Sequence, residues 1–139
     1  MKKRTVGAAG LLLVAGLVYV WSQSSWLDNF NADRNQEYTV KRDAGLAFGH
    51  SHNQNQCLTQ ALKGFDECTG YTCTIGNGKF LKACLETAEP SADFCDGVPA
   101  YQEDITEDEK TWARHTCWDL NIASDGCRLL LRQKQFFCQ

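Results

Sequence analysis

Eight cysteines, all between Cys57 and Cys138, constrain the fold of this chain more than any other feature of its sequence. None lies in the first 56 residues. Such a density is typical of small domains that fold in oxidising compartments, where disulfides persist. A region of 82 residues builds only a modest apolar core, so covalent cross-links are expected to stabilise it.

The cysteines recur at a spacing of eleven residues, which is about three turns of a helix. Two cysteines at this spacing on one helix lie about 16 Å apart along its axis, whereas a disulfide needs α-carbons within about 7 Å. Cross-links must therefore run between different helices. The spacing occurs in Cys57 and Cys68, Cys73 and Cys84, Cys84 and Cys95, and Cys127 and Cys138.

An antiparallel helical hairpin with its turn near residues 69–72 satisfies this condition in the first half of the region, because facing residues then have a constant sum of numbers. A second hairpin in the other half would bring its cysteines together less regularly. Eight cysteines allow about 105 pairings, so the resulting set is a hypothesis. It pairs Cys57 with Cys84, Cys68 with Cys73, Cys117 with Cys127, and Cys95 with Cys138.

The nested pair of cross-links in Cys57–Cys84 resembles the twin-cysteine helical hairpins of the mitochondrial intermembrane space. Those hairpins carry C-x9-C on each helix, whereas this chain carries C-x10-C. The resemblance implies a shared hairpin geometry, and a mitochondrial location is the lesser alternative that it adds.

Other uses of cysteine fit the spacing less well. Structural zinc sites use pairs such as C-x2-C, and the closest pair here is C-x4-C at Cys68 and Cys73. Thiol oxidoreductases and covalent haem both need C-x-x-C, which the sequence lacks. We therefore expect structural disulfides, with no metal and no cofactor.

The beginning of the chain indicates export. Three basic residues, Lys2, Lys3 and Arg4, precede an uncharged, largely apolar run over residues 5–27. This pattern predicts a single membrane-spanning helix over residues 1–27, with its N-terminus in the cytoplasm and the rest of the chain in the periplasm of a bacterial cell. A cleaved signal peptide, which would leave a secreted or periplasmic protein, is the alternative, because Ser22 to Ser24 form a small-x-small cleavage site.

The remaining chain divides into a polar tether and a compact domain. Residues 28–56 are rich in Asn, Gln and Asp, and their apolar positions fix no helical or strand period, so we expect a tether there. A short ordered piece around residues 38–48 could dock on the domain, which covers residues 57–139. Beyond the basic start, 11 Lys and Arg stand against 17 Asp and Glu. This acidic balance disfavours nucleic acid as a partner.

Helix signals recur through the compact domain, and strand signals are almost absent. The pattern predicts an all-α fold of two disulfide-stapled helical hairpins. The expected helices are residues 56–65, capped by Asn53 and ending near Gly64; residues 79–88, opened by Asn77 and Gly78; residues 107–123, capped by Thr106 with Glu109; and residues 127–138, capped by Ser124 or Asp125.

The candidate binding residues are two tryptophans and an acidic run. Two tryptophans six residues apart lie on different sides of a helix, so at least one of them is expected to be exposed. The acidic run could receive a basic surface of a partner, although such a run is more often a solvated helix start. These candidates are Trp112, Trp118, Glu103, Asp104, Glu107 and Asp108.

The predicted function is therefore protein binding in the cell envelope, as an accessory subunit of a complex or as an immunity or inhibitor protein. The sequence holds no nucleophile motif or phosphate-binding loop, so we do not expect an enzyme. Two alternatives remain. A small exported hydrolase could use His115 and Asp119, which are four residues apart on a helix, and a metal-handling protein could use His50 and His52.

Overall fold

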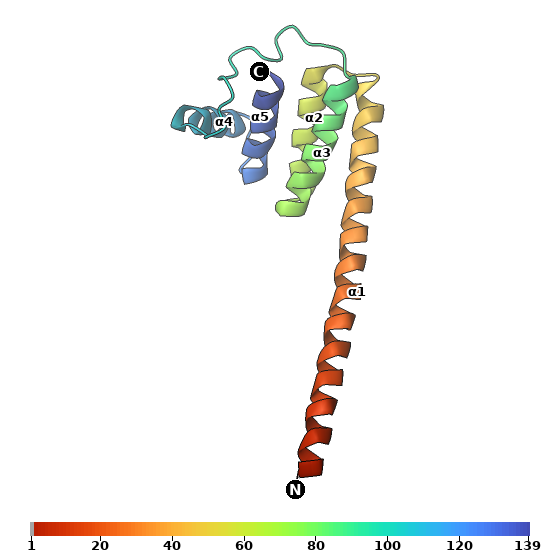
Figure 1. Cartoon of the computed structure of the whole chain (residues 1–139). Helices are drawn as coiled ribbons and strands as arrows, with labels where there is room; N and C mark the ends of the chain where they lie inside the picture. The colour runs from red at the N-terminus through yellow and green to blue at the C-terminus, as the bar shows by residue number, and fades with distance from the viewer. Residues whose placement is uncertain (1) are drawn as a thin grey trace. The chain divides into compact units, whose positions relative to one another are not determined.

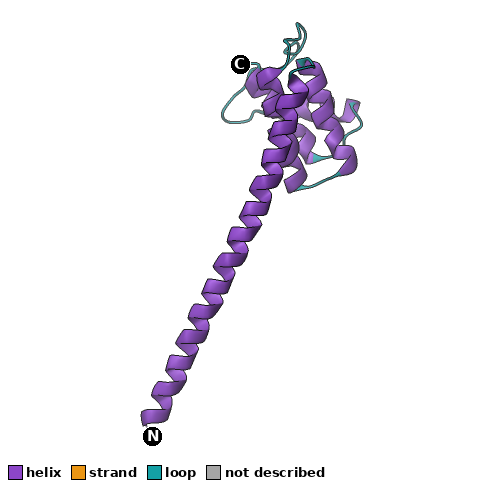
Figure 2. Ribbon diagram, turned by 90° about the vertical axis from the view of Figure 1, so that its right-hand side faces the viewer, coloured by secondary structure: helices purple, strands orange, loops and turns teal. Residues whose placement is uncertain are grey.

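The computed structural model describes the backbone of residues 2–139, and the side chains of all of these except residues 2–9, 23, 24 and 67. Apart from an isolated bridge between Asn53 and Glu89, the described residues contain no β structure, so the predicted all-α class is confirmed. Figures 1 and 2 show the helices α1 (Lys2–Gly49), α2 (Gln54–Glu67), α3 (Tyr71–Thr87), α4 (Glu107–Asp119) and α5 (Asp125–Phe137).

The chain divides into two compact units, Met1–Gln36 and Glu37–Gln139, and α1 contributes to both. In the first unit, α1 carries a stretch that is long and apolar enough to cross a membrane, and no second such helix occurs in the described part of the chain. A signal sequence near the N-terminus would also meet these requirements of length and composition. The helix is thus consistent with both a membrane anchor and a cleaved signal peptide, the two alternatives drawn from the sequence.

The second unit begins at Glu37, in the last turns of α1. These turns lie within residues 28–56, where the sequence had predicted a polar tether. These turns are helical as far as Gly49, and they pack on α3. Gly45 lies against the backbone of Phe80, and Gly49 lies against Cys84 and Thr87. Phe48 adds an aromatic contact, because its ring lies 5.7 Å from the Phe80 ring and packs on the core. Two of the contact positions are thus glycines, which contribute nothing to an apolar period in the sequence.

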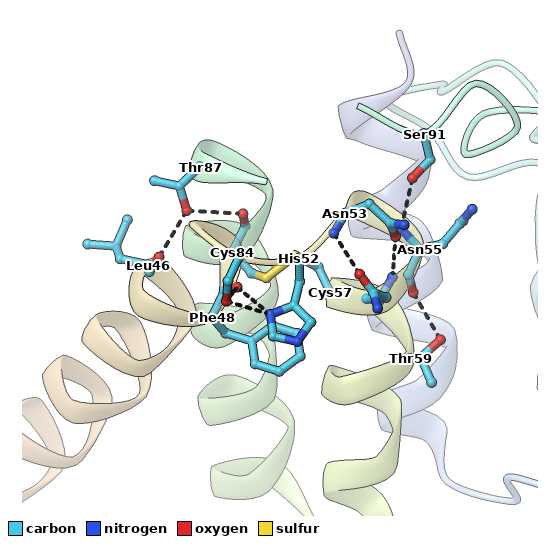
Figure 3. The surroundings of a disulfide bond; sticks show 12 residues. Leu46, Phe48, His52, Asn53, Asn55, Cys57, Thr59, Cys84, Thr87 and Ser91 are labelled. Atoms are coloured by element: carbon cyan, nitrogen blue, oxygen red, sulfur yellow. Dashed lines mark hydrogen bonds between the residues drawn. A yellow bond between two sulfur atoms is a disulfide. The ribbon is translucent and has the colours of Figure 1, made fainter. Parts of the chain in front are cut away.

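Figure 3 shows where the end of α1 meets the hairpin formed by α2 and α3. The hydroxyl of Thr87 donates a hydrogen bond to the Leu46 carbonyl oxygen of α1 at 3.0 Å. At the start of α2, the Asn53 side chain accepts a hydrogen bond from the Gln56 backbone, and the Gln56 side chain accepts one from the Asn53 backbone. This capping box, which the sequence predicted, holds the turn between α1 and α2.

The hairpin of α2 and α3 is longer than the sequence predicted at its closed end. Helix α2 continues beyond Gly64 to Glu67, and α3 begins at Tyr71 rather than after Asn77 and Gly78. Asn77 is buried within α3 and packs against Gly64. Gly64 therefore allows the two helices to approach closely instead of ending one of them.

Four disulfides cross-link the second unit, and no described cysteine is free. Their α-carbons are 5.5 to 6.1 Å apart, which is the usual range for this bond. They are the same four pairs as in the hypothesis drawn from the sequence, in which the constant sum applied to the first hairpin alone. They join Cys57 to Cys84, Cys68 to Cys73, Cys95 to Cys138, and Cys117 to Cys127.

Helices α4 and α5 complete the second unit. Helix α5 packs against α2 and α3, and α4 packs against α5. Figure 1 shows α4 and α5 running in different directions. Thr106 and Glu109 form the predicted capping box of α4, and the Ser124 side chain caps α5. The core has contributions from all four of these helices and from the segment before α4. Its largest fully buried apolar side chains are Phe94, Leu81, Leu130 and Leu131.

Candidate functional site

A buried carboxylate fixes α4 to α5 and to the irregular segment between α3 and α4. The side chain of Glu109 is only 2% exposed. One of its oxygens accepts hydrogen bonds from the Gln135 side chain at 2.7 Å and from the Gln102 backbone at 3.2 Å. The other accepts from the Thr106 backbone at 2.6 Å. Every described polar neighbour of this carboxylate thus stabilises its ionised form.

Arg132 completes this cluster. Its guanidinium lies 3.3 Å from the Glu109 carboxylate and donates hydrogen bonds to the Gln102 and Glu103 carbonyl oxygens at 2.7 and 3.2 Å. Hydrogen bonds from the Thr106 backbone and side chain, opposed by desolvation, lower the pKa of Glu109 to about 2, and those from Gln102 and Gln135 add to the effect. The cluster is saturated internally, so we assign it to the architecture of α4 and α5 rather than to a ligand.

Beside this cluster, α4 and α5 form a hollowed surface. One hollow of about 350 Å³ has Ile105, Ala113 and Leu129 among its apolar lining residues. A second hollow, of about 180 Å³, has Trp118 and Ile122 among its lining residues. Both hollows include Arg114, Asp125 and Arg128, so they form one continuous surface. We call these eight residues the α4–α5 face.

The α4–α5 face exposes large apolar side chains to solvent. Trp118 and Leu129 are each 58% exposed, and Ile105 is 42% exposed. Contiguous exposed apolar surface that also carries charge is a feature of protein interaction sites. The disulfide between Cys117 and Cys127 joins the two helices directly beneath it, so the face rests on a covalently fixed base.

A separate shallow groove of about 350 Å³ lies between α3 and α5. Leu85, Phe136 and Phe137 are its apolar lining residues, and Lys82, Glu86 and Gln133 are its polar ones. The Tyr101 and Phe136 rings pack edge to face, with ring centres 5.2 Å apart. This groove shares no lining residue with the α4–α5 face, so variants can distinguish the two surfaces.

The predicted binding residues occupy different environments. Trp118 belongs to the α4–α5 face, whereas Trp112 is partly buried and packs on the core. The four acidic candidates are all exposed, and the structure gathers them at the start of α4 and just before it. They are Glu103, Asp104, Glu107 and Asp108. A hydrogen bond from Lys110 and its charge lower the pKa of Glu107. Their role in binding stays a prediction.

The proposed hydrolytic pair lies on the exposed side of α4. The His115 and Trp118 rings pack edge to face, with ring centres 5.2 Å apart. Among the side chains that the structure describes, His115 and Asp119 form no hydrogen bond or ion pair with each other, and neither lines a described hollow. The geometry therefore offers this pair no enclosed site for a substrate.

The two other histidines lie at the end of α1. The His52 ring stacks on Phe48 at 3.6 Å, and its Nδ1 lies 2.8 Å from the Phe48 carbonyl oxygen (Figure 3). His52 thus helps to end the helix, while His50 is exposed. The described residues contain no group of three or more His, Cys, Asp or Glu side chains that could hold a metal ion.

The cations and aliphatic residues of the α4–α5 face were not predicted as site residues from the sequence. A signal for Leu129 was present, because the helical phase that places Cys127, Leu130 and Leu131 on the core side leaves Leu129 on the other side. Arg114 and Arg128 gave no comparable signal, since exposed arginines are common on helices. Only the packing of α4 on α5 brings them together.

Comparisons with known proteins do not place the chain in a family. No family model matches it, and no solved structure matches it. A curated relative, BEL1-like homeodomain protein 7 of Arabidopsis thaliana, is 30% identical over 93 residues, which is 64% of this chain and 18% of that protein. The chain thus spans less than a fifth of that relative's length, and the match carries no functional argument here.

Proposed function

We propose that this protein is a binding module of the cell envelope, anchored by α1 and presenting a disulfide-stapled helical body to a protein partner outside the cytoplasm. The apolar stretch of α1 after a basic start supports membrane insertion with the body exported. Four disulfides support an oxidising compartment such as the periplasm.

The observation that carries the binding role is the exposed apolar surface of the α4–α5 face. Tryptophan is among the residues most often found at the energetic centre of protein interfaces, and Trp118 stands exposed in this face. A rigid surface loses little conformational entropy when it binds, because its helices are already fixed by the Cys117–Cys127 disulfide. An accessory subunit and an immunity or inhibitor protein would both use such a surface.

Co-purification of the tagged full chain from its native membrane tests this proposal. Cells would be treated with a crosslinker and solubilised in mild detergent, and bound proteins would be identified by mass spectrometry. We expect one partner at a fixed ratio with the wild type. Loss of a central tryptophan contact typically weakens an interface by about 2 kcal/mol or more, so recovery should fall strongly with Trp118→Ala.

Phe136→Ala is the matched control, because it removes an exposed aromatic side chain from the α3–α5 groove instead. It should leave the partner bound. Equal recovery with all three proteins, or loss with Phe136→Ala alone, would exclude the α4–α5 face as the binding surface. Absence of any partner at a fixed ratio would contradict an accessory role in that cell.

A further inference from the structure

We infer that the α4–α5 face binds an acidic amphipathic segment of its partner, in which apolar side chains are flanked by carboxylates. This inference rests on the binding role proposed above and specifies the chemistry of the partner.

The first observation is the charge that borders the face. The larger hollow is lined by Lys110, Arg114, Arg128 and Arg132, but by only two carboxylates, Glu109 and Asp125. Glu109 is buried, and its oxygens are occupied by internal donors, including Arg132. It therefore offers little to a ligand. Asp125 is the accessible carboxylate of this hollow, and the accessible cations Lys110, Arg114 and Arg128 outnumber it.

The second observation is how weakly the accessible cations are engaged. Arg114 forms no hydrogen bond or ion pair with any side chain that the structure describes. Arg128 pairs with Asp125, and Lys110 pairs with Glu107, but both pairs are solvent-exposed. Exposed pairs of this kind contribute about 0–1 kcal/mol, so a partner carboxylate can replace them at little cost.

The third observation is that apolar and cationic groups alternate along the face. Arg114 and Arg128 lie in both hollows, and Trp118 borders one hollow while Leu129 borders the other. A segment that filled both hollows would pass directly over the two arginines. Apolar side chains at helical spacing, with Asp or Glu between them, complement this arrangement.

The alternative occupant with matching chemistry is an anionic lipid surface. The exported part of the chain carries more Asp and Glu than Lys and Arg, 17 against 11 once the three basic residues at the start are set aside. Such a body is repelled by an anionic bilayer beyond the reach of a local contact. A single peptide segment meets only the local cations, so the observations favour the peptide.

A peptide-display selection on the full chain in nanodiscs of zwitterionic lipid tests the inference. The probe is a library of random 16-residue peptides, selected separately on the wild type and on Arg114→Gln/Arg128→Gln. We expect the wild type to enrich sequences with Asp or Glu between apolar residues three or four positions apart. Individual enriched peptides should bind the double variant about three- to tenfold more weakly.

Lys79→Gln is the matched control, because it removes an exposed cation of α3 that lies outside the face. It should bind the same peptides as the wild type. A charge swap makes the test sharper, since peptides with Lys in place of Glu should bind Arg114→Glu/Arg128→Glu better than they bind the wild type. The absence of free thiols in each variant would show that its disulfides have formed.

Several outcomes would overturn the inference. One is selection of no peptides, or of peptides without acidic residues. Another is equal selection by the double variant. Binding of added phosphatidylglycerol vesicles that depends on both arginines, without acidic peptides, would assign the face to lipid. If co-purification finds a partner sensitive to Trp118→Ala while the selection fails, the binding role stands and only the acidic chemistry is wrong.

Discussion

Replacement of Gly45 by alanine should release the last turns of α1 from α3. A methyl group at this position would overlap the Phe80 carbonyl oxygen and lie 3.1 Å from the Ala83 side chain. The obstacle is backbone, so the helices must move apart, at a typical overpacking cost of about 1–3 kcal/mol. Alanine also favours the helix by about 1 kcal/mol relative to glycine. The net loss is therefore up to about 2 kcal/mol, a factor of about 30 in the opening equilibrium.

Hydrogen exchange of the full chain in detergent measures this equilibrium directly, through the peptides that cover residues 37–49. Gly76→Ala is the control, because its new methyl group would meet only the Lys41 side chain at an ordinary 3.5 Å. Exchange in the control should be unchanged or slower. If Gly45→Ala exchanges as slowly as the wild type over residues 37–49, the close contact between α1 and α3 is not what holds this segment.

Three further predictions concern the body. Glu109 has a pKa below its ordinary value of 4.5, so its contribution to stability is present above about pH 4.5 and is lost as pH falls towards 2. Over this pH range the free energy of unfolding of Glu109→Gln should therefore fall less steeply than that of the wild type. Loss of the Cys95–Cys138 disulfide, which closes a loop of 43 residues, should lower the free energy of unfolding measured in urea titrations by about 4 kcal/mol. Loss of the Cys68–Cys73 disulfide, which closes a loop of 5 residues, should lower it by about 2 kcal/mol. Without reductant, alkylation followed by mass spectrometry should find no thiols, and after reduction it should find eight.

The parts of the fold that local sequence rules determine were predictable. The capping boxes at Asn53 and Thr106 each need only residues three positions apart, so the sequence alone reveals them. Two of the cysteine pairs, Cys57–Cys84 and Cys68–Cys73, followed from hairpin geometry, because a turn near residues 69–72 brings both pairs within bonding distance. The turn is at that place, between α2 and α3. The other two pairs were a looser hypothesis, which the structure confirms.

The parts that depend on contacts between distant elements were not predictable. Asn77 followed by Gly78 has the composition of a helix start, yet Asn77 is buried inside α3 beside Gly64 of α2. Similarly, Glu109 stands in an acidic run that a solvated helix start would also show. Its burial depends on Arg132 and Gln135, which lie more than 20 residues further along the chain.

The candidate site also combines a part that local sequence rules predict with a part that depends on contacts between helices. The prediction that at least one of the two tryptophans would be exposed followed from helical phase alone, and Trp118 is the exposed one. The face around it requires Leu129 and the two arginines from two helices, α4 and α5. No local pattern specifies how these two helices pack on each other.

Site-specific photo-crosslinking in living cells tests the central claim most directly. A photo-reactive amino acid would replace Trp118, Leu129 or, as the control, the exposed Thr59 of α2. The account predicts one crosslinked protein of defined mass from positions 118 and 129, and none from position 59. Crosslinks from position 59 alone, or from none of the three positions, would contradict a binding surface on the α4–α5 face.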